Sequence, residues 1–454
     1  MSSRSPQPAF HIVTFGCQMN KLDAELLAAA LARSGYRQVA EPEQADVLIY
    51  ATCSVRDHAE NRVLSHLGAW RARAGRDPHF VLGVVGCMAQ RMGQEIVRRF
   101  PHVRLVCGTR AFLRVPGHLD RIAATGEAVV DVGEEDFAFK RDPGLRSERH
   151  HAYVSIMRGC DNYCAYCIVP YVRGPEVSRP PGEVLDEVRR LCDDGVVEVT
   201  LLGQNVNSYG KGLGGPPYGG LAGLLELLND VPGLKRLRFV TSHPRDMSEE
   251  ILQAVARLDK ACEHLHVPPQ SGSDSVLKRM RRGYDRTRYL ELVRRARHII
   301  PAVELSGDFL VGFPGETEAD FEQSLSLLRE VRFQQSFIFK YSPRPGTLAA
   351  RWPDDVPEAA KRERNQRMLD AQAQVDEQRR GAMVGRVVEV LVDGANPAGA
   401  GGRRLSGRTR GGDIVFFSDP AVADPEAAGR MAGELCRVRL TGATPLTLFG
   451  ERCD

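Results

Sequence analysis

The chain has 454 residues, of which 43% are hydrophobic and 26% charged; this composition is typical of a soluble globular protein with two or three domains and excludes an intrinsically disordered one. The formal net charge of +3 is too small to identify a nucleic-acid-binding protein, so any site for a polyanion must be a local patch. No apolar run approaches the roughly 18 residues of a membrane span, and the N-terminal stretch MSSRSPQPAFH has no signal-peptide character. We therefore expect a cytoplasmic protein without membrane contact, whose eleven cysteines are mostly reduced and serve metal binding or catalysis where they cluster.

The first segment, residues 9–125, repeats one pattern three times: a short apolar strand, a cysteine and an amphipathic stretch. FHIVTFGC ends at Cys17, ADVLIYATC at Cys53 and HFVLGVVGC at Cys87. Alternating strands and helices predict a doubly wound parallel sheet, and such sheets bind ligands at the carboxyl ends of their strands. All three cysteines fall at that edge, so we expect them to form one metal site. Cys107 also ends a strand-like run and could replace Cys87, but it lacks the preceding glycine and is predicted to be a core residue.

Residues 126–145 carry many charges and little apolar periodicity, so they are predicted to be a linker. From residue 146 to 380, strand-like and helical stretches alternate about six times, which predicts a full or partial parallel (β/α) barrel with its chemistry in the loops after the strands. A helix over residues 353–381 is expected to lead into the third segment.

The third segment, residues 381–454, changes to a period of two between glycine-rich turns, which predicts a small all-β barrel or sandwich. Residues 379–410 contain seven arginines against two acids, Glu389 and Asp393. A small basic β-barrel fits nucleic-acid binding. A solvated basic face on a capping domain explains the same pattern equally well.

The stretch MRGCDNYCAYCIVPYVRG places Cys160, Cys164 and Cys167 in a C-x3-C-x2-C arrangement with no fourth cysteine. A structural zinc ion requires four protein ligands, and an electron-carrier cluster requires four cysteines in a tight run that ends in Cys-Pro. No nearby cysteine or histidine has a suitable spacing for either. A four-iron cluster whose fourth iron stays open for a small molecule accounts for the incomplete set.

This motif, with Tyr166 before its last cysteine, resembles that of the radical S-adenosylmethionine (SAM) enzymes. The resemblance extends in order through TFGCQMN, ATCSVRDHAENRV, GVVGCMAQR, LLGQNVNSY, TSHP, QSGSD, DFLVGFPGET and RPGT, which resemble the methylthiotransferases over nearly the whole chain. TFGCQMN and TSHP are most similar to the branch that acts on isopentenyladenosine in tRNA. The resemblance implies an N-terminal methylthiotransferase domain, a radical SAM core and a C-terminal RNA-binding TRAM barrel.

The resemblance also implies two four-iron, four-sulfur (4Fe–4S) clusters. Cys160, Cys164 and Cys167 would hold the cluster that binds SAM and cleaves it to a 5′-deoxyadenosyl radical, because C2 of adenine has no acidic proton and acid–base groups cannot open its C–H bond. The second cluster, whose open iron carries the sulfur to be transferred, would be held by the three N-terminal cysteines (Cys17, Cys53 and Cys87). The resemblance implies that each turnover uses two SAM molecules and that the substrate is the tRNA anticodon loop. It also implies a reductant such as flavodoxin or ferredoxin, and a chain that acts as a monomer or weak homo-oligomer.

Contacts to SAM are implied at several positions after the barrel strands. By resemblance, Tyr166 stacks on the adenine of SAM. Gln204 and Asn205, at the end of the second strand, hold the methionine end. The ribose and adenine are approached by two serines and two glycines, Ser271, Ser273, Gly312 and Gly315. His243 in TSHP is equally consistent with a ligand contact and with a structural role. The basic run 278–288 could contact tRNA phosphates or be a solvated helix face.

The sequence therefore predicts methylthiolation at C2 of N6-isopentenyl(dimethylallyl)adenosine at position 37 of tRNA. The same chemistry on N6-threonylcarbamoyladenosine, or on an aspartate of a ribosomal protein, is an alternative. A non-catalytic RNA-binding iron–sulfur protein is an alternative of another class, and it would not consume SAM under reducing conditions.

Overall fold

The structure, a computed structural model, describes residues 7–54, 57–133, 146, 148–213, 219–395, 404–422 and 425–453. The chain divides into two compact units. The sheet unit comprises Met1–Ser147, Arg158–Asp161 and Cys167–Glu176, and the barrel unit comprises Glu148–Met157, Asn162–Tyr166 and Val177–Asp454. Among the described residues, no helix combines the length and the apolar composition that crossing a bilayer requires.

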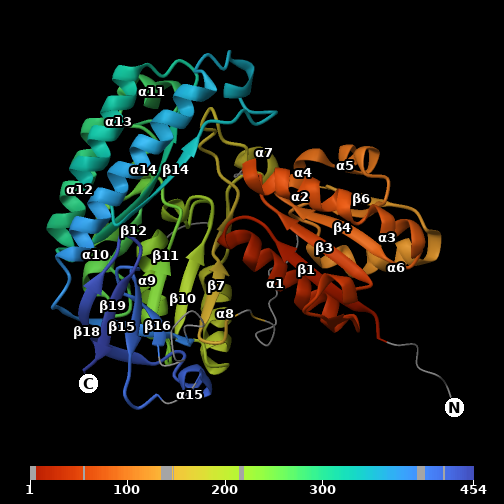
Figure 1. Cartoon of the computed structure of the whole chain (residues 1–454), viewed down its shortest axis with the longest axis horizontal. Helices are drawn as coiled ribbons and strands as arrows, with labels where there is room; N and C mark the ends of the chain where they lie inside the picture. The colour runs from red at the N-terminus through yellow and green to blue at the C-terminus, as the bar shows by residue number, and fades with distance from the viewer. Residues whose placement is uncertain are drawn as a thin grey trace. The chain divides into compact units, whose positions relative to one another are not determined.

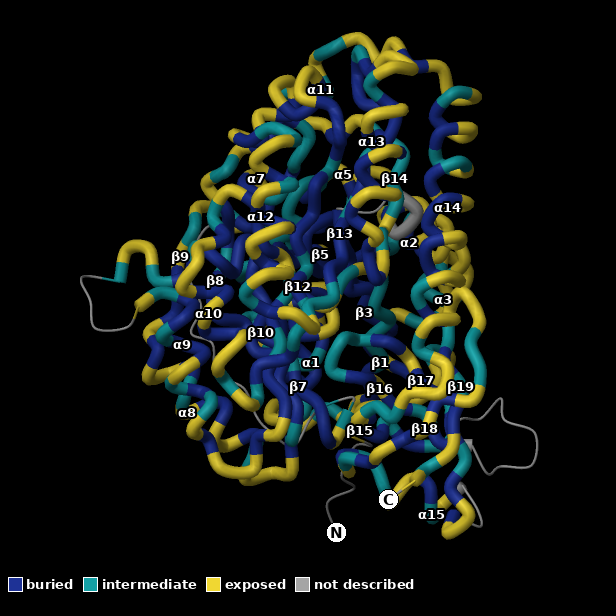
Figure 2. Tube along the Cα trace, turned by 90° about the vertical axis from the view of Figure 1, so that its left-hand side faces the viewer, coloured by how far each residue is buried: buried dark blue, intermediate teal, exposed yellow. Residues whose placement is uncertain are grey.

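The sheet unit is built on six parallel strands in the order β2-β1-β3-β4-β5-β6 (Figure 1). The central strands β3 and β4 are mostly apolar and buried along their whole length, as expected for a parallel sheet covered on both faces. Figure 2 draws buried residues in dark blue and exposed residues in yellow. The strands are β1 (Ala9–Thr14), β2 (Arg37–Gln38), β3 (Val47–Thr52), β4 (Val81–Gly86), β5 (Val103–Cys107) and β6 (Val129–Asp131).

Helices cover both faces of this sheet, which confirms the predicted doubly wound fold. They are α1 (Gln18–Arg33), α2 (Asp57–Ala69), α3 (Arg71–Arg76), α4 (Cys87–Met92), α5 (Gln94–Arg99) and α6 (Val115–Thr125), with short 3-10 turns η1 (Pro42–Gln44) and η2 (Phe112–Arg114). One face packs against α1, η2 and α6, and the other against α2, α4 and α5. Alternate residues of β3 serve the two layers, with Ile49 in the first and Tyr50 in the second.

The boundaries of the sheet unit differ from those expected from the sequence. β6 is the last strand of the sheet, so the segment 126–145, expected to be a linker, begins inside the domain; its residues 134–145 lie outside the described part of the chain. Helix α7 (Val169–Arg173), just after the C-x3-C-x2-C motif, also belongs to the sheet unit. The charges of the expected linker lie mostly after residue 133, and the three-residue strand β6 is too short to show a periodicity in the sequence.

The barrel unit contains six parallel strands in two groups of three, β7-β10-β11 and β12-β13-β14. A parallel bridge between Leu237 and Ala261 joins the groups, which gives the predicted partial barrel. The strands are β7 (His151–Ser155), β10 (Glu198–Leu202), β11 (Arg236–Phe239), β12 (His264–His266), β13 (Glu304–Val311) and β14 (Gln335–Lys340). Two short strands, β8 (Met157–Arg158) and β9 (Val177–Ser178), flank the cysteine loop in sequence.

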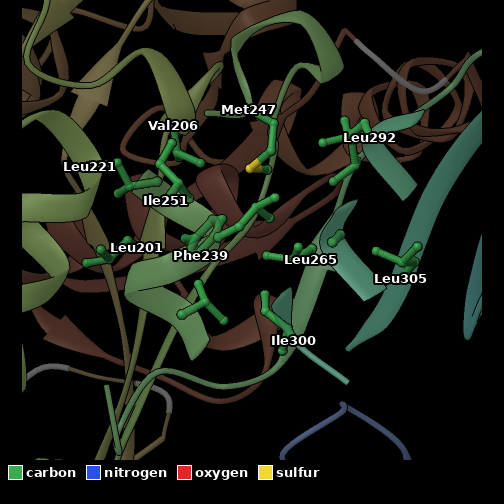
Figure 3. Packing of buried hydrophobic residues seen from close by; sticks show 14 of the residues in the cluster. Leu201, Val206, Leu221, Phe239, Met247, Ile251, Leu265, Leu292, Ile300 and Leu305 are labelled. Atoms are coloured by element: carbon green, nitrogen blue, oxygen red, sulfur yellow. The ribbon is translucent and has the colours of Figure 1, made fainter. Parts of the chain in front are cut away.

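The barrel strands pack against helices through one apolar cluster. Figure 3 shows Leu201, Phe239 and Leu265, from three successive strands, meeting side chains from the surrounding helices such as Ile251 and Leu292. The helices and turns are α8 (Pro181–Asp193), η3 (Val206–Ser208), α9 (Gly220–Asn229), η4 (Pro244–Asp246), α10 (Glu249–Arg257), α11 (Asp274–Arg279), α12 (Arg286–Ile299), α13 (Glu318–Val331), η5 (Ala349–Arg351) and α14 (Glu358–Gly381). The helix expected over 353–381 is α14, and its residues Met368, Ala371 and Val375 are buried in this cluster.

The C-terminal segment forms a closed barrel in the order β15-β16-β17-β19-β18, which confirms the predicted small all-β domain and is consistent with a TRAM barrel. Its strands are antiparallel except for the parallel pair β17–β19. The elements are β15 (Val387–Ala395), β16 (Arg404–Thr409), β17 (Ile414–Ser418), α15 (Pro425–Arg430), β18 (Leu435–Ala443) and β19 (Leu448–Arg452).

Buried arginines tie this small barrel to the rest of the barrel unit. Arg236 has no exposed surface and donates to the Arg408 carbonyl at 2.6 Å and to Glu389 Oε1 at 3.0 Å. Three of the seven arginines in 379–410 serve the same purpose: Arg379 and Arg380 bind Asp413, and Arg410 binds Glu263. The basic run is therefore in part an internal ion-pair network, which a periodicity analysis could not detect.

Candidate functional site

The three N-terminal cysteines lie at one edge of the sheet, at the carboxyl ends of neighbouring strands. Cys17 is the N-cap of α1 after β1, Cys53 follows β3, and Cys87 is the first residue of α4 after β4. The strand order reverses between β1 and β3, and ligands in open α/β sheets bind at such a switch point. The structure thus brings together three residues that are far apart in sequence.

Two glycines permit this close approach. A Cβ on Gly16 would lie 2.4 Å from Cβ of Cys53, and a Cβ on Gly86 would lie 2.5 Å from the Thr52 carbonyl oxygen. Both glycines have positive φ, +142° and +101°, a region that L-residues rarely adopt. The Gly-Cys step before Cys17 and Cys87 is therefore a steric requirement of the site.

Asn20 links the ends of three strands. Cys17 Sγ lies 3.3 Å from Asn20 Oδ1, and Asn20 Nδ2 donates to the Thr52 carbonyl at 2.7 Å. Thr52 Oγ1 in turn donates to the Val85 carbonyl at 2.7 Å. The two bonds of this chain to backbone carbonyls are buried, and the one to Cys17 is partly buried; together they fix the loops that carry the cysteines relative to one another.

The pKa of the Cys17 thiol is lowered to about 6. A hydrogen bond from Cys53 has the largest effect, and burial opposes it; the positive charge of Arg173 and the backbone amides of Asn20 and Met19 also favour the thiolate. Thiolates at helix N-termini and beside cations are stabilised in this way, and the thiolate is the form that ligates a metal.

Cys87 lies in a more enclosed environment. Burial raises the pKa of its thiol, while Arg173 partly counteracts that effect. Arg173 Nε lies 3.3 Å from Cys87 Sγ, and Arg173 Nη2 donates to Asp23 Oδ2 at 2.6 Å. Cys87 also packs against Ile168 and Val172 of the segment that follows the C-x3-C-x2-C motif. Ile168 is next in sequence to Cys167, so the chain itself leads from one cysteine set to the other.

Cys107 is placed differently. It is the last residue of β5, fully buried in the cluster between the sheet and helices α1 and α6, and burial raises its thiol pKa far above the usual range. Its surroundings are those of a small core side chain, as predicted.

Among the described residues, no three His, Cys, Asp or Glu side chains converge on a single metal ion. A 4Fe–4S cluster binds each thiolate to a different iron, so its ligands surround a volume and do not meet at a point. Three thiols at one sheet edge, one of them with a lowered pKa, fit such a cluster.

The second cysteine set lies in the loop after β7, the first barrel strand. Gly159, at φ +72°, precedes Cys160, and a Cβ there would lie 1.9 Å from the Pro175 carbonyl oxygen; the Cys160 amide donates to the Gly174 carbonyl at 3.2 Å. Ala165 anchors the loop in the barrel unit, because its amide donates to the Met280 carbonyl at 3.0 Å and its carbonyl accepts from Ala349 at 2.8 Å.

Arg282 is buried beside this set. Its Nη1 lies 3.4 Å from Cys164 Sγ, its Nε 3.1 Å from the Tyr284 hydroxyl and its Nη2 3.2 Å from the Pro268 carbonyl. All three acceptors are uncharged groups or the thiol, and Arg282 forms no ion pair with a carboxylate of the described chain.

The carboxyl ends of β10 and β11 present buried polar atoms without a protein partner: Asn205 Oδ1, Ser242 Oγ and His243 Nε2. Buried polar groups are normally hydrogen-bonded, so these atoms fit a polar ligand such as the amino-acid part of SAM. Asn205 and Gln204 follow the end of β10 rather than closing it. Asn205 Nδ2 donates to Asp246 Oδ2 at 2.7 Å, which fixes the amide.

His243 has a structural role, and its ligand contact stays a prediction. Its Nδ1 accepts from the Arg245 amide at 3.2 Å and caps η4, which is a structural role. Burial, aided by Arg282 and Arg245, lowers its pKa to about 2, so the ring is neutral and Nε2 carries its proton. That Nε2 is one of the atoms without a partner, so the ring can also donate to a ligand.

Tyr166 packs edge-to-face on Phe313, with ring centroids 6.4 Å apart, and is partly exposed. The predicted serines already have partners: Ser271 Oγ contacts Ser324 Oγ at 3.1 Å, and Ser273 Oγ donates to Asp320 Oδ1 at 2.5 Å. These bonds tie the QSGSD loop to α13, so a contact of Tyr166, Ser271 or Ser273 with SAM stays a prediction.

The two glycines of VGFPGET, Gly312 and Gly315, are explained by local packing. A Cβ on Gly312 would lie 2.4 Å from Lys361 Cγ, and one on Gly315 would lie 1.7 Å from an Arg279 guanidinium nitrogen. Both have positive φ, +71° and +75°. Close approach to neighbouring side chains explains them without a cofactor, and their proposed role toward SAM also stays a prediction.

Sequence reasoning missed Asp23, Arg173 and Arg282. Arg173 in IVPYVRG and Asp23 on the buried face of α1 are charged residues within an apolar context, whereas Arg282 lies in the basic run 278–288. Charged side chains are rarely buried unless paired, so a charge in an apolar stripe was the available signal. The basic run 278–288 is divided: Arg282 is buried, whereas Arg286 binds Glu330 at 2.8 Å.

Two protein-family models match the chain. A model of the radical SAM superfamily matches residues 154–328, which includes the C-x3-C-x2-C motif. A model described as uncharacterized protein family UPF0004 matches residues 9–108, which includes Cys17, Cys53 and Cys87.

Curated relatives cover the chain almost end to end. The tRNA-2-methylthio-N(6)-dimethylallyladenosine synthase of Moorella thermoacetica is 46% identical over 449 residues and covers 98% of each chain. Proteins of the same name from Pelotomaculum thermopropionicum and Clostridium botulinum are 43% and 42% identical, and each match covers 97% of this chain and at least 96% of the relative.

Solved structures share the fold at low identity. The radical SAM methyltransferase TsrM from Kitasatospora setae, with cobalamin and a 4Fe–4S cluster bound, aligns with a TM-score of 0.56 and 14% identity over 76% of this chain and 77% of its own. The cobalamin-dependent SAM radical enzyme OxsB aligns with a TM-score of 0.52 and 12% identity over 82% of this chain, which spans 56% of the OxsB chain. At more than 40% identity to curated relatives over nearly its full length, the chain belongs to the tRNA-2-methylthio-N(6)-dimethylallyladenosine synthases, the MiaB branch of the radical SAM methylthiotransferases.

Proposed function

We propose that this protein methylthiolates C2 of N6-isopentenyl(dimethylallyl)adenosine at position 37 of tRNA. The observation that carries the proposal is the presence of both cysteine sets, each in its own matched domain, in a chain 46% identical over 98% of its length to a protein named for this reaction. Methylthiolation of N6-threonylcarbamoyladenosine or of a ribosomal-protein aspartate is the nearest alternative, since it would need the same two cysteine sets.

Cys160, Cys164 and Cys167 would hold one 4Fe–4S cluster, and Cys17, Cys53 and Cys87 a second. A reductant such as flavodoxin or ferredoxin would supply the electron for SAM cleavage through the first site, and the sulfur to be transferred would come from the second. The protein's contribution is to hold the thiolates, to exclude water and to orient SAM. Burial of Cys53, Cys87, Cys160 and Cys164 accounts for the exclusion of water.

SAM would bind at the carboxyl ends of the barrel strands. Asn205, Ser242 and His243 offer buried polar atoms there without a protein partner, and Gln204 lies in the same loop as Asn205. Neutral His243 can donate from Nε2, and Asn205 Oδ1 can accept from an ammonium group. Tyr166, Ser271, Ser273, Gly312 and Gly315 would complete the cofactor contacts. Two SAM molecules would be used in each turnover.

The substrate would be the anticodon loop of tRNA, in the cytoplasm, with the chain acting as a monomer or weak homo-oligomer. C2 of the adenine must reach the site, so the nucleotide has to leave the loop stack, at a cost of a few kcal/mol. An apolar isopentenyl group can offset that cost by burial, at roughly 0.8 kcal/mol per CH₂. A threonylcarbamoyl group carries a carboxylate and would need a cationic partner.

Competition among three anticodon stem-loop RNAs tests the proposal. Loops bearing isopentenyladenosine, threonylcarbamoyladenosine and unmodified adenosine are mixed with the doubly reconstituted protein, SAM and a reductant, and the nucleosides are measured by mass spectrometry. We expect the isopentenyl loop to be preferred over unmodified adenosine at least a hundredfold, about 2.7 kcal/mol. Preferred methylthiolation of the threonylcarbamoyl loop would refute the substrate assignment and leave the two-cluster chemistry intact.

A further inference from the structure

Each cysteine set has one buried arginine directed at one of its sulfur atoms. In the sheet unit Arg173 Nε lies 3.3 Å from Cys87 Sγ, and in the barrel unit Arg282 Nη1 lies 3.4 Å from Cys164 Sγ. Both residues are buried, with 7% of the surface of Arg173 and 5% of that of Arg282 exposed. Both are thus placed to donate a charge-assisted hydrogen bond to a thiolate.

The two arginines differ in what balances their charge. Arg173 is paired with Asp23 at 2.6 Å, with both side chains below 10% exposed. The other donors of Arg282 go to the Tyr284 hydroxyl and the Pro268 carbonyl, which are neutral. The net charge of the buried group is therefore close to zero beside Cys87 and +1 beside Cys164.

We propose that Arg282 raises the reduction potential of the cluster at Cys160, Cys164 and Cys167, and that Asp23 cancels the same effect of Arg173 at the N-terminal cluster. Reduction adds negative charge to a cluster, and net charge and hydrogen bonds to the sulfurs set its potential. An unbalanced cation in a buried site favours the reduced form, whereas a neutral ion pair has a weak field. The inference rests on the proposed presence of both clusters and makes Arg173, Asp23 and Arg282 positioning residues.

Redox titration followed by electron paramagnetic resonance tests this. Each cluster is studied alone, in chains whose other cysteine set is replaced by alanine. We expect Arg282→Gln to lower the midpoint potential of the radical-generating cluster by 59 mV or more, a tenfold change in the one-electron equilibrium constant. Asp23→Asn leaves Arg173 unbalanced and should raise the potential of the N-terminal cluster by a similar amount.

Two controls keep the test decisive. Arg257→Gln removes an exposed arginine of the barrel unit that pairs with Glu226 and, among the described residues, contacts no cysteine; it should leave both potentials unchanged. If Arg282→Gln fails to load iron, Arg282→Lys takes its place, because it retains the positive charge. Its equilibrium constant for one-electron reduction of the cluster should stay within about threefold of the wild-type value. A larger drop with Lys, or an unshifted potential with Gln at full iron content, overturns the inference. The potentials are measured without tRNA, so failure of the proposed reaction leaves this result standing.

A separate observation concerns the surface of the barrel unit next to the cysteine loop. A cavity of about 500 Å³ lies between η4 and α12, lined by Arg245, Arg288, Arg294 and Arg295, with Glu291 as its single acid. Arg288, Arg294 and Arg295 are exposed, and in the described part of the chain no carboxylate forms an ion pair with them. Arg245 also binds Asn162, between Cys160 and Cys164.

We propose that this cavity binds backbone phosphates of the tRNA anticodon stem-loop. Arginine forks match phosphate oxygens bidentately. Arg245 is paired with Asp246 at 3.1 Å, so the other three arginines against Glu291 leave an excess of two positive charges, which complements a polyanion. The contact of Arg245 with the cysteine loop places such a phosphate near the proposed SAM site, where the substrate nucleotide must enter. This inference names the binding surface for the substrate of the proposed function.

Salt-dependent binding of an unmodified anticodon stem-loop RNA tests this surface. Arg288→Gln, Arg294→Gln and Arg295→Gln should each reduce the log–log slope of affinity against salt by roughly 0.7–0.9 per lost phosphate contact. Arg189→Gln on α8, an exposed arginine 3.9 Å from Asp186, should not. Unchanged slopes in all three variants overturn the assignment. Because the RNA is unmodified, binding is measured independently of turnover, so loss of the reaction alone does not affect the outcome.

Discussion

Cys160, Cys164 and Cys167 come from eight consecutive residues of one loop, whereas Cys17, Cys53 and Cys87 come from the ends of three strands of a sheet. The chain itself keeps the first set close. The second set depends on strand order, on two glycines that remove side-chain bulk and on the hydrogen bonds of Asn20. Two sites with the same ligand type therefore differ in which changes can damage them.

The largest effect separates the two sets by chemistry. Reconstitution should give about eight irons per chain, and replacing either set by alanine should remove about half. The chain without Cys160, Cys164 and Cys167 should form no 5′-deoxyadenosine. The chain without Cys17, Cys53 and Cys87 should still form it but transfer no sulfur. Iron analysis and chromatography of the nucleoside products measure both, and equal radical formation in the two chains would reverse the assignment.

Steric change at the sheet edge should damage only the dispersed set. In Gly86→Ala the new Cβ meets the Thr52 carbonyl at 2.5 Å, and positive φ adds roughly 1–2 kcal/mol. We expect loss of the N-terminal cluster, about half of the iron, with 5′-deoxyadenosine formation retained. Gly35→Ala is the matched control, because Gly35 has φ +89° but no atom within 4 Å of the added Cβ. Full iron in Gly86→Ala would show that the strand ends can move apart.

Removing the hydrogen bonds that align the sheet edge should have a smaller effect. Asn20→Ala loses contacts to Cys17 and to the Thr52 carbonyl. Substitution of groups that orient metal ligands commonly costs 10–100-fold in affinity. We expect the N-terminal cluster to lose iron to a chelator about 10–100-fold faster, with the other cluster unaffected. Equal loss rates from both clusters would show that Asn20 acts on the fold as a whole.

The smallest effect is expected at the fourth cysteine of the sheet. Cys107→Ala removes one buried sulfur from an apolar cluster, so the free energy of unfolding should fall by about 1–2 kcal/mol with the iron content unchanged. Cys87→Ala provides the comparison, since it should lose the N-terminal cluster. Iron loss in Cys107→Ala with retention in Cys87→Ala would exchange their roles.

Most of the fold followed from local patterns. The strand–cysteine–helix repeat predicted the doubly wound sheet, the alternation to residue 380 predicted the partial barrel, and the period of two predicted the closed β-barrel. Edges were less predictable: β6 lies in the expected linker, and α7 belongs to the sheet unit. A short edge strand and a five-residue helix carry too little periodicity to be recognised.

The sequence by itself determined the residue types and spacings that the chemistry requires: the compact C-x3-C-x2-C motif and three cysteines that each follow an apolar strand. Only the tertiary structure decided what surrounds them. It placed Arg173 with Asp23 beside Cys87, and it placed Arg282 beside Cys164, where no carboxylate of the described residues forms an ion pair with it. It also placed Arg379, Arg380 and Arg410 in ion pairs that join the small β-barrel to the rest of the barrel unit. A motif is read from neighbours along the chain, whereas the energy of a buried charge depends on partners that are distant in sequence and meet only when the chain folds.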